Sequence, residues 1–271
     1  MRISAIVGAA LLAAACTQAR PGPSTASPSA PPDGTAPAMV AAAYRQVAAD
    51  QLTVAASRAD GEPDIGLTPG AVSAGQRVWV LETLGDWHLV VAEGVRDELT
   101  LPFGWVPGQL DRADTLEATG MSCPSSPMPV SRLVGLGMFG GLACYGSEPI
   151  DFDGFTPIAC GIGGSPRTGT PDWLNGTWSG MTIGDREPAP PDHEVGQFLT
   201  ARAAPGAVSL GGCGDPGWRR FLGHFDDPAS AACRTETSDA AGTTRVVDPR
   251  LSELLCRSEL VLTEAIPIAQ P

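Results

Sequence analysis

A histidine and two neighbouring aspartates form the tightest group of side chains in this sequence that could do acid–base or metal chemistry. His224 is followed by Asp226 and Asp227. An imidazole beside a carboxylate can act as an acid–base pair or supply half of a metal site. The alternative is structural, because Asp-Asp-Pro is typical of a helix start, where one carboxylate caps backbone N–H groups. We treat the three residues as catalytic candidates and favour the structural interpretation.

The remaining acid and histidine patterns favour enzyme chemistry even less. Asp151 and Asp153 occupy alternate positions and so share one face of a strand, where a third oxygen ligand would allow calcium binding. A solvated strand face is the simpler interpretation. His193-Glu194 lacks the second histidine of a zinc protease motif, and the sequence has no Gly-x-Ser-x-Gly nucleophile elbow. We therefore predict no enzymatic activity, no metal and no cofactor.

Charge and composition exclude further classes of function. The formal net charge is −13, which disfavours a nucleic-acid partner because phosphates would be repelled. All 17 basic residues are arginine. Chemistry that requires lysine, such as a Walker A loop or a Schiff base, is therefore excluded.

The pattern of the first 16 residues predicts that the chain is exported. Arg2 is followed by an uncharged run from Ile3 to Ala15, which is too short to span a bilayer and reads as a signal peptide over residues 1–15. The small residues that lead into Cys16 resemble the lipobox of bacterial lipoproteins. That resemblance implies that the Cys16 sulfur is lipidated and anchors the chain to the outer face of the cell membrane. Plain secretion and an uncleaved anchor helix are the alternatives.

Beyond Cys16 the cysteines form an even set, and all of them come after residue 120. They are Cys123, Cys144, Cys160, Cys213, Cys233 and Cys256. In an oxidising compartment such a set predicts three disulfides, with 15 connectivities open. The second half of the chain is therefore predicted to be cross-linked by disulfides, and the first half is not.

Residues 16–38 are rich in proline, serine and alanine and predict a disordered tether. Residues 39–51 are alanine-rich, with Val40, Tyr44 and Val47 at helical spacing, and predict a short helix. Residues 113–122 read as a polar connector between two domains.

Between these segments, residues 52–112 have the pattern of short strands. Alternating residues at 77–83 and 87–92 flank Gly85-Asp86 and predict a β-hairpin, with further strands at 52–55 and 103–107. The order Gly-Asp-Trp and then Gly-Trp-Val resembles the bacterial SH3 domain family. This resemblance implies a small barrel that binds cell-wall peptides or proteins, with Trp79, Trp87 and Trp105 lining or supporting a groove. The alternative is that these rings belong to the core.

Residues 123–271 predict a second, disulfide-stapled domain. Strands are expected over 144–158, 198–203, 218–225 and 258–266, with short helices after Asp227 and over 249–255. A strand, the turn from Gly223 to Pro228, a helix and a further strand resemble the second half of an oligonucleotide/oligosaccharide-binding (OB) barrel. An uncharacterised family of exported bacterial domains, which carries no activity to transfer, is resembled more closely by the runs Leu142–Gly146, Pro171–Leu174, Gly223–Ala229 and Cys256-Arg257. The predicted fold class is thus mainly β, with an SH3-like barrel followed by an OB-like barrel.

The function predicted from the sequence is that of a non-catalytic, lipid-anchored binding protein of the bacterial cell envelope. Its expected partner is cell-wall polymer or another exported protein. One alternative is an exported hydrolase in which the SH3-like domain delivers substrate to His224, Asp226 and Asp227. The other is a structural subunit of an envelope complex.

Overall fold

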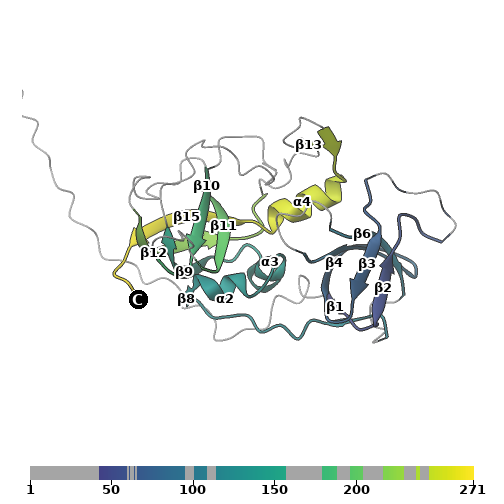
Figure 1. Ribbon diagram of the computed structural model, residues 1–271, viewed down its shortest axis with the longest axis horizontal. Helices are drawn as coiled ribbons and strands as arrows, with labels where there is room; N and C mark the ends of the chain where they lie inside the picture. Colours follow the sequence, from purple (N-terminus) through teal and green to yellow (C-terminus); the bar gives the residue numbers. More distant parts are fainter. Residues whose placement is uncertain are drawn as a thin grey trace, which may run out of the picture. The chain divides into compact units, whose positions relative to one another are not determined.

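Strands dominate the part of the chain that the computed structural model describes (Figure 1), which confirms the mainly β fold class. The described residues are 43–59, 61, 64, 66–94, 101–108, 114–156, 179–187, 196–203, 216–228, 236–238 and 244–271. The predicted signal peptide, Cys16 and the tether lie outside them. None of the described helices has the length and apolar content needed to cross a membrane.

The first sheet has five antiparallel strands in the order β6-β5-β4-β1-β7. The strands are β1 (Tyr44–Val47), β4 (Arg77–Leu84), β5 (Trp87–Ala92), β6 (Phe103–Pro107) and β7 (Leu116–Ala118). The predicted hairpin is present as β4 and β5. Gly85 has a φ of +60° in its two-residue turn, a conformation that glycine adopts without strain.

A second hairpin, β2 (Gln51–Val54) with β3 (Gly70–Ser73), is joined to the first sheet through β6. Ala55 bridges to Trp105 and Thr68 bridges to Phe103, in both cases antiparallel. The strands expected at 52–55 and 103–107 are therefore present, and they lie side by side.

Two expectations in this half are wrong. Residues 44–47 form strand β1, where a helix over 39–51 was expected, and Leu116–Ala118 of the expected connector forms β7 and pairs with β1. The three-residue spacing of Tyr44 and Val47 fits one face of a helix, but in a strand it places the two side chains on opposite faces. Each face of β1 packs into its own apolar cluster, so both side chains are buried.

The second sheet contains six strands in the order β10-β11-β15-β12-β9-β8. They are β8 (Met128–Pro129), β9 (Ile150–Thr156), β10 (Ser179–Gly184), β11 (Phe198–Ala203), β12 (Gly217–His224) and β15 (Leu260–Pro267). β10 also pairs with β9 at Gly184 and Phe155, so the strand order returns to β9. The pair β11–β15 is parallel, as is β8–β9.

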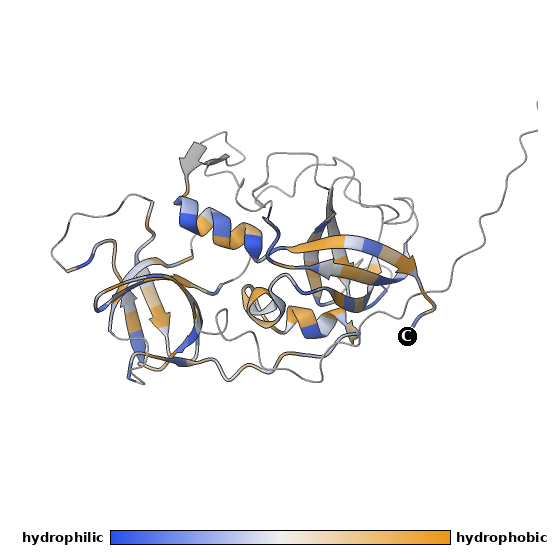
Figure 2. Ribbon diagram, turned by 180° about the vertical axis from the view of Figure 1, so that it is seen from behind, coloured by the Kyte–Doolittle hydropathy of each residue, from blue (hydrophilic) through white to orange (hydrophobic). Residues whose placement is uncertain are grey.

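Three helices accompany this sheet: α2 (Val130–Val134), α3 (Gly140–Tyr145) and α4 (Pro249–Arg257). Helix α2 packs on β9, β10 and β11. Helix α4 begins as the sequence predicts, with Asp248 accepting a hydrogen bond from the Arg250 backbone N–H and with proline at the first position. Figure 2 shows apolar and polar residues alternating along α4. A short pair, β13 (Glu236–Ser238) and β14 (Thr244–Val246), precedes it.

The strand expected over 144–158 begins later than predicted. Residues up to Tyr145 belong to α3, and only Ile150–Thr156 form strand β9. A Cβ on Gly141 would overlap the ring of Phe225, so the helix can approach this ring closely only because glycine stands there. Tertiary packing thus outweighs the low helix propensity of Gly140-Gly141.

The larger apolar cluster runs through both halves of the chain. Trp79 of the first sheet packs edge-on against Phe139, with ring centroids 6.0 Å apart. In the second half, the rings of Phe152 and Phe221 stack with their centroids 5.2 Å apart. All the described residues belong to one compact unit, so the interior is continuous across the expected boundary at 113–122.

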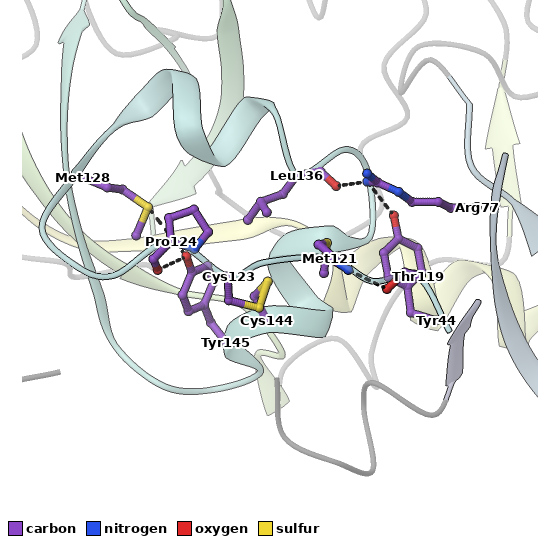
Figure 3. The surroundings of a disulfide bond; sticks show 10 residues. All are labelled: Tyr44, Arg77, Thr119, Met121, Cys123, Pro124, Met128, Leu136, Cys144 and Tyr145. Carbon is purple, nitrogen blue, oxygen red and sulfur yellow. Dashed lines mark hydrogen bonds between the residues drawn. A yellow bond between two sulfur atoms is a disulfide. The ribbon is translucent and has the colours of Figure 1, made fainter. Parts of the chain in front are cut away.

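A disulfide joins Cys123 to Cys144 and ties the segment before α2 to the end of α3 (Figure 3). Beside it, the Tyr145 hydroxyl donates to the Pro124 carbonyl at 2.6 Å. Cys256 is disulfide-bonded as well. Cys160, Cys213 and Cys233 lie outside the described residues. The short helix expected after Asp227 also lies outside them, except for Pro228.

Gly104 of β6 provides a test of how closely the β2 hairpin approaches the first sheet. A Cβ there would overlap the Ala55 carbonyl oxygen and lie 3.0 Å from Val54 Cγ1. We expect Gly104→Ala to lower the free energy of unfolding by about 1–3 kcal/mol in urea titrations, because a backbone atom cannot move aside. The matched control is Gly217→Ala in β12, where nothing lies within 4 Å. It should leave stability unchanged or raise it by about 0.5–1 kcal/mol. Equal losses in both variants would contradict the close approach.

Candidate functional site

The candidate acid–base cluster is occupied by structural contacts. The Arg257 guanidinium donates to both carboxylate oxygens of Asp226, at 2.6 and 3.2 Å. The hydrogen bond to Asp226 raises the pKa of Arg257, as expected for a cation paired in this way. The His224 Nδ1 atom lies 2.9 Å from the Phe225 carbonyl oxygen, and Asp227 follows Asp226 directly. A carboxylate held by a bidentate guanidinium is a poor general base, so the contacts favour the structural interpretation.

The aspartates on β9 are also held by neighbours. Arg220 lies directly opposite Asp153 on β12 and donates to both of its carboxylate oxygens, at 2.9 and 3.0 Å. The backbone of Asp151 exchanges two hydrogen bonds with the Ser126 hydroxyl. Across the described ranges, no three His, Cys, Asp or Glu side chains gather closely enough to hold a metal ion.

Two of the three tryptophans of the expected groove are core residues. Trp79 packs between Tyr44 and Phe139, and Trp105 is 2% exposed. The indole N–H of Trp105 donates to Asp64 at 2.6 Å, and the Arg58 guanidinium lies over the ring at 5.0 Å. Trp87 is half-buried against the larger cluster. The structure therefore does not expose the three rings as a groove, because β4, β5 and β6 direct them mostly into the interior.

A pocket of about 310 Å³ lies where α2, α3, β11 and β15 meet the end of β5. Its described lining residues carry no charge and most are apolar. They are Gly94, Leu133, Val134, Gly137, Met138, Gly141, Phe198, Leu199, Thr200, Phe225, Ser258 and Leu260. Ligand sites commonly have volumes of about 300–1,000 Å³ and mostly apolar walls with a few polar groups, which describes this pocket.

Aromatic rings from two different elements line the pocket. Phe225 lies against Gly141 of α3 and stacks on Tyr145, with ring centroids 6.5 Å apart. Phe198 of β11 is 40% exposed, and it is the only lining residue among the large apolar side chains that stand out from the described surface. An exposed aromatic ring beside a hollow is a favourable contact for an apolar group of a ligand.

The turn between α2 and α3 forms one wall of the pocket and is held by the first sheet. Glu93 Oε1 accepts hydrogen bonds from the Tyr44 hydroxyl at 2.8 Å and from the Phe139 backbone N–H at 3.3 Å. Arg77 donates to the Leu136 carbonyl at 2.9 Å, a contact visible in Figure 3. We call the hydrogen bonds that Glu93 accepts from Tyr44 and Phe139, together with the one that Arg77 donates to Leu136, the Glu93 clasp. Burial and the nearby carboxylate raise the pKa of the Tyr44 hydroxyl, so it stays protonated and donates.

A second polar bridge connects the first sheet to α4. The Arg250 guanidinium donates to Glu82 of β4 at 2.7 Å and to Asp248 at 2.8 Å. Burial alone would raise the pKa of the Asp248 carboxyl, but the hydrogen bonds from Arg250 lower it below its usual range. None of these three residues lines the pocket.

His88 gives the structure a defined response to pH. It is 2% exposed, its Nδ1 lies 3.0 Å from Thr83 Oγ1, and burial lowers its pKa. Below pH ~6.5 the unfolded chain binds a proton that the folded chain does not, so stability falls as the pH decreases from there to the lowered pKa. We expect this group to make the free energy of unfolding fall as the pH is lowered from 7 to 5. Replacing His88 by Asn should flatten the slope over that range, and an unchanged slope would contradict it.

Sequence reasoning did not identify the pocket. Its lining residues come from five separate stretches of the chain, between residues 94 and 260, and among them only Phe225 belongs to a sequence motif, the turn from Gly223 to Pro228. The only local signal is glycine at 137 and 141, where side chains would overlap Glu93 and Phe225. Comparisons with protein-family models, curated proteins and solved structures find no match to this chain.

Proposed function

We propose that this protein is a non-catalytic, lipid-anchored binding protein on the outer face of a bacterial cell membrane, and that it binds its partner through the apolar pocket at β11. The observation that carries the proposal is the pocket itself. Its volume, its uncharged described lining and the exposed Phe198 ring together provide a place for an apolar group of a ligand.

The sheet topology supports a binding fold of the OB type. Starting from β9, the strand order is β9-β10-β11-β15-β12 and back to β9, with β11 and β15 parallel. An OB barrel is a five-stranded Greek-key barrel that binds ligands on its second and third strands. Those positions correspond to β10 and β11 here, and β11 contributes Phe198, Leu199 and Thr200 to the pocket.

The first half supports a resemblance to SH3 domains in a similar way. A five-stranded antiparallel sheet and the β2–β3 hairpin meet at β6 around a separate apolar cluster. The members of this cluster are Val47, Leu52, Val54, Val72, Val78, Val80, Val90, Ala92, Val106 and Leu116. In a small barrel, strands of one sheet pair with strands of the other, as β6 does here with the β2–β3 hairpin.

Export and lipidation rest on the sequence of residues 1–16 and on the oxidised cysteines. A disulfide between Cys123 and Cys144 is suited to an oxidising compartment outside the cytoplasm. The tether would then carry the folded part away from a membrane-bound Cys16.

The chemistry of the pocket favours an exported protein over cell-wall polymer as the partner. Glycan chains present hydroxyls that need hydrogen-bond partners, and the described lining offers side-chain hydroxyls only at Thr200 and Ser258. The Ser258 hydroxyl already donates to the Leu255 carbonyl. An apolar side chain of a protein needs no such partners and gains from burial. The alternative of a hydrolase is disfavoured because the carboxylate of Asp226, one of its candidate catalytic residues, is held in an ion pair with Arg257.

The pocket is tested by filling it. Val134 lines the pocket at the end of α2, and Val134→Phe would occupy part of its volume. We expect the wild-type chain to bind the neutral apolar fluorophore N-phenyl-1-naphthylamine saturably. The variant should bind it roughly tenfold more weakly, which corresponds to about 1.4 kcal/mol. Fluorescence titration of the purified protein measures both affinities.

The matched control for the pocket is Leu84→Phe, which makes a similar change at an exposed apolar residue of β4 outside the lining. It should bind the fluorophore as the wild type does. If Val134→Phe binds as well as the wild type, or if Leu84→Phe loses as much affinity, the pocket is not the binding site.

Lipidation and disulfide formation are tested together by intact mass spectrometry of protein extracted from the producing bacterium. We expect a mature chain that begins at Cys16 and carries the mass of a diacylglyceryl group. On reduction, its mass should increase by two hydrogens for each of three bridges. Cys16→Ala should abolish the added lipid mass and leave the bridges. A leader still present on protein with free thiols would refute the proposed location.

A further inference from the structure

We propose that contacts from the first sheet position one wall of the binding pocket, the turn between α2 and α3. In this proposal Glu93 is a positioning residue for that turn. This inference rests on the proposed function, in which the pocket binds the partner. It differs from the expectation for a modular SH3-like domain, which would act as a separate targeting unit. Here the carboxylate that accepts a hydrogen bond from Tyr44 of the first sheet also accepts one from Phe139, beside the residues against which a ligand would pack.

The wall lies between two points of attachment. Gly137 and Met138 both line the pocket, and they are flanked by Leu136 and Phe139. The carbonyl of Leu136 accepts from Arg77, and the N–H of Phe139 donates to Glu93. Backbone hydrogen bonds to α2 also hold the turn, and the contacts of both flanking residues with Arg77 and Glu93 add a restraint from the first half of the chain.

Burial makes these contacts effective. The Phe139 and Tyr44 side chains are almost wholly buried, and the Glu93 side chain is only 16% exposed. Hydrogen bonds to an ionised group are stronger than neutral ones, and exclusion of water strengthens them further. Arg77 lies 3.8 Å from the second oxygen of Glu93, so the carboxylate keeps a cation beside it. Loss of Glu93 would leave the Phe139 N–H and the Tyr44 hydroxyl without their acceptor.

The fit between Glu93 and the turn leaves no room for a side chain at 137. Gly137 has a φ of +81°, and a Cβ there would overlap the Glu93 carboxylate. The next residue after Glu93, Gly94, itself lines the pocket. Glu93 is therefore the sequence neighbour of one pocket residue, Gly94. Its carboxylate also packs directly against another, Gly137.

The test compares two acidic residues of the first half that both reach into the second half. Glu93→Ala removes the acceptor for the turn, and Glu93→Gln keeps an oxygen that can accept from Tyr44 and Phe139. Glu82→Ala removes the contact to Arg250, whose partners lie outside the pocket. We expect Glu93→Ala to weaken binding of N-phenyl-1-naphthylamine about tenfold, with Glu93→Gln and Glu82→Ala within about threefold of the wild type.

A readout independent of any ligand is amide hydrogen exchange in peptides that cover residues 136–141. Exchange at Phe139 should become faster in Glu93→Ala and remain near the wild-type rate in Glu93→Gln and Glu82→Ala. Global unfolding measured in urea distinguishes this local change from a general loss of stability. If Glu93→Ala does not fold, Arg77→Met takes its place with the same expectations, because it removes the donor to the Leu136 carbonyl together with the cation beside Glu93.

The inference is overturned if Glu93→Ala leaves exchange in the turn unchanged, or if Glu82→Ala loosens the turn as much. It is also overturned if the turn loosens without any loss of affinity for the fluorophore. If the wild-type chain does not bind the fluorophore at all, the proposed function fails, and the exchange measurements still decide whether Glu93 holds the wall.

Discussion

The arrangement of this protein depends on one largely buried carboxylate, that of Glu93, which is shared between two parts of the chain. Glu93 is the first residue after β5. Its side chain accepts hydrogen bonds from Tyr44 at the start of β1 and from Phe139 directly before α3. Without it, a buried N–H and a buried hydroxyl would lack an acceptor, which typically costs about 1–3 kcal/mol for each group. Trp79 and Phe139 meet beside these contacts, so the polar clasp and the apolar interior stabilise the same junction. Two segments that look like separate domains in the sequence therefore form one unit.

The fold could be predicted from the sequence where its causes are local. The β4–β5 hairpin follows from alternation on both sides of Gly85-Asp86, and α4 follows from Asp248-Pro249 at its start. Strand β1 could not be predicted, because the spacing of its apolar residues fits a helix and only the two separate clusters explain it. Helix α3 could not be predicted either, since its glycines disfavour a helix and the reason for them is the ring of Phe225.

The candidate site was beyond sequence reasoning for a different reason. Aspartates were visible as candidates, but their arginine partners were not, because Arg220 meets Asp153 only through the register of β12 with β9. Asp226 likewise meets Arg257, at the end of α4, only in the folded structure. In both cases the planar guanidinium fork, in a chain whose basic residues are all arginine, turns a candidate acid into a structural anion. No single motif marks the pocket, since segments far apart in the chain each contribute one to three residues.

The disulfide between Cys123 and Cys144 has a consequence for the biogenesis of the protein. Every pocket residue of α2, of the following turn and of α3 lies inside the covalent loop that this bond closes. Closing a loop of this length restricts the unfolded chain and, by the entropic account, stabilises the folded one by about 3 kcal/mol. A newly made chain in a reducing cytoplasm would lack that restraint on one side of its pocket. Under the proposed export, this covalent restraint on the pocket would form only after translocation, where the compartment is oxidising.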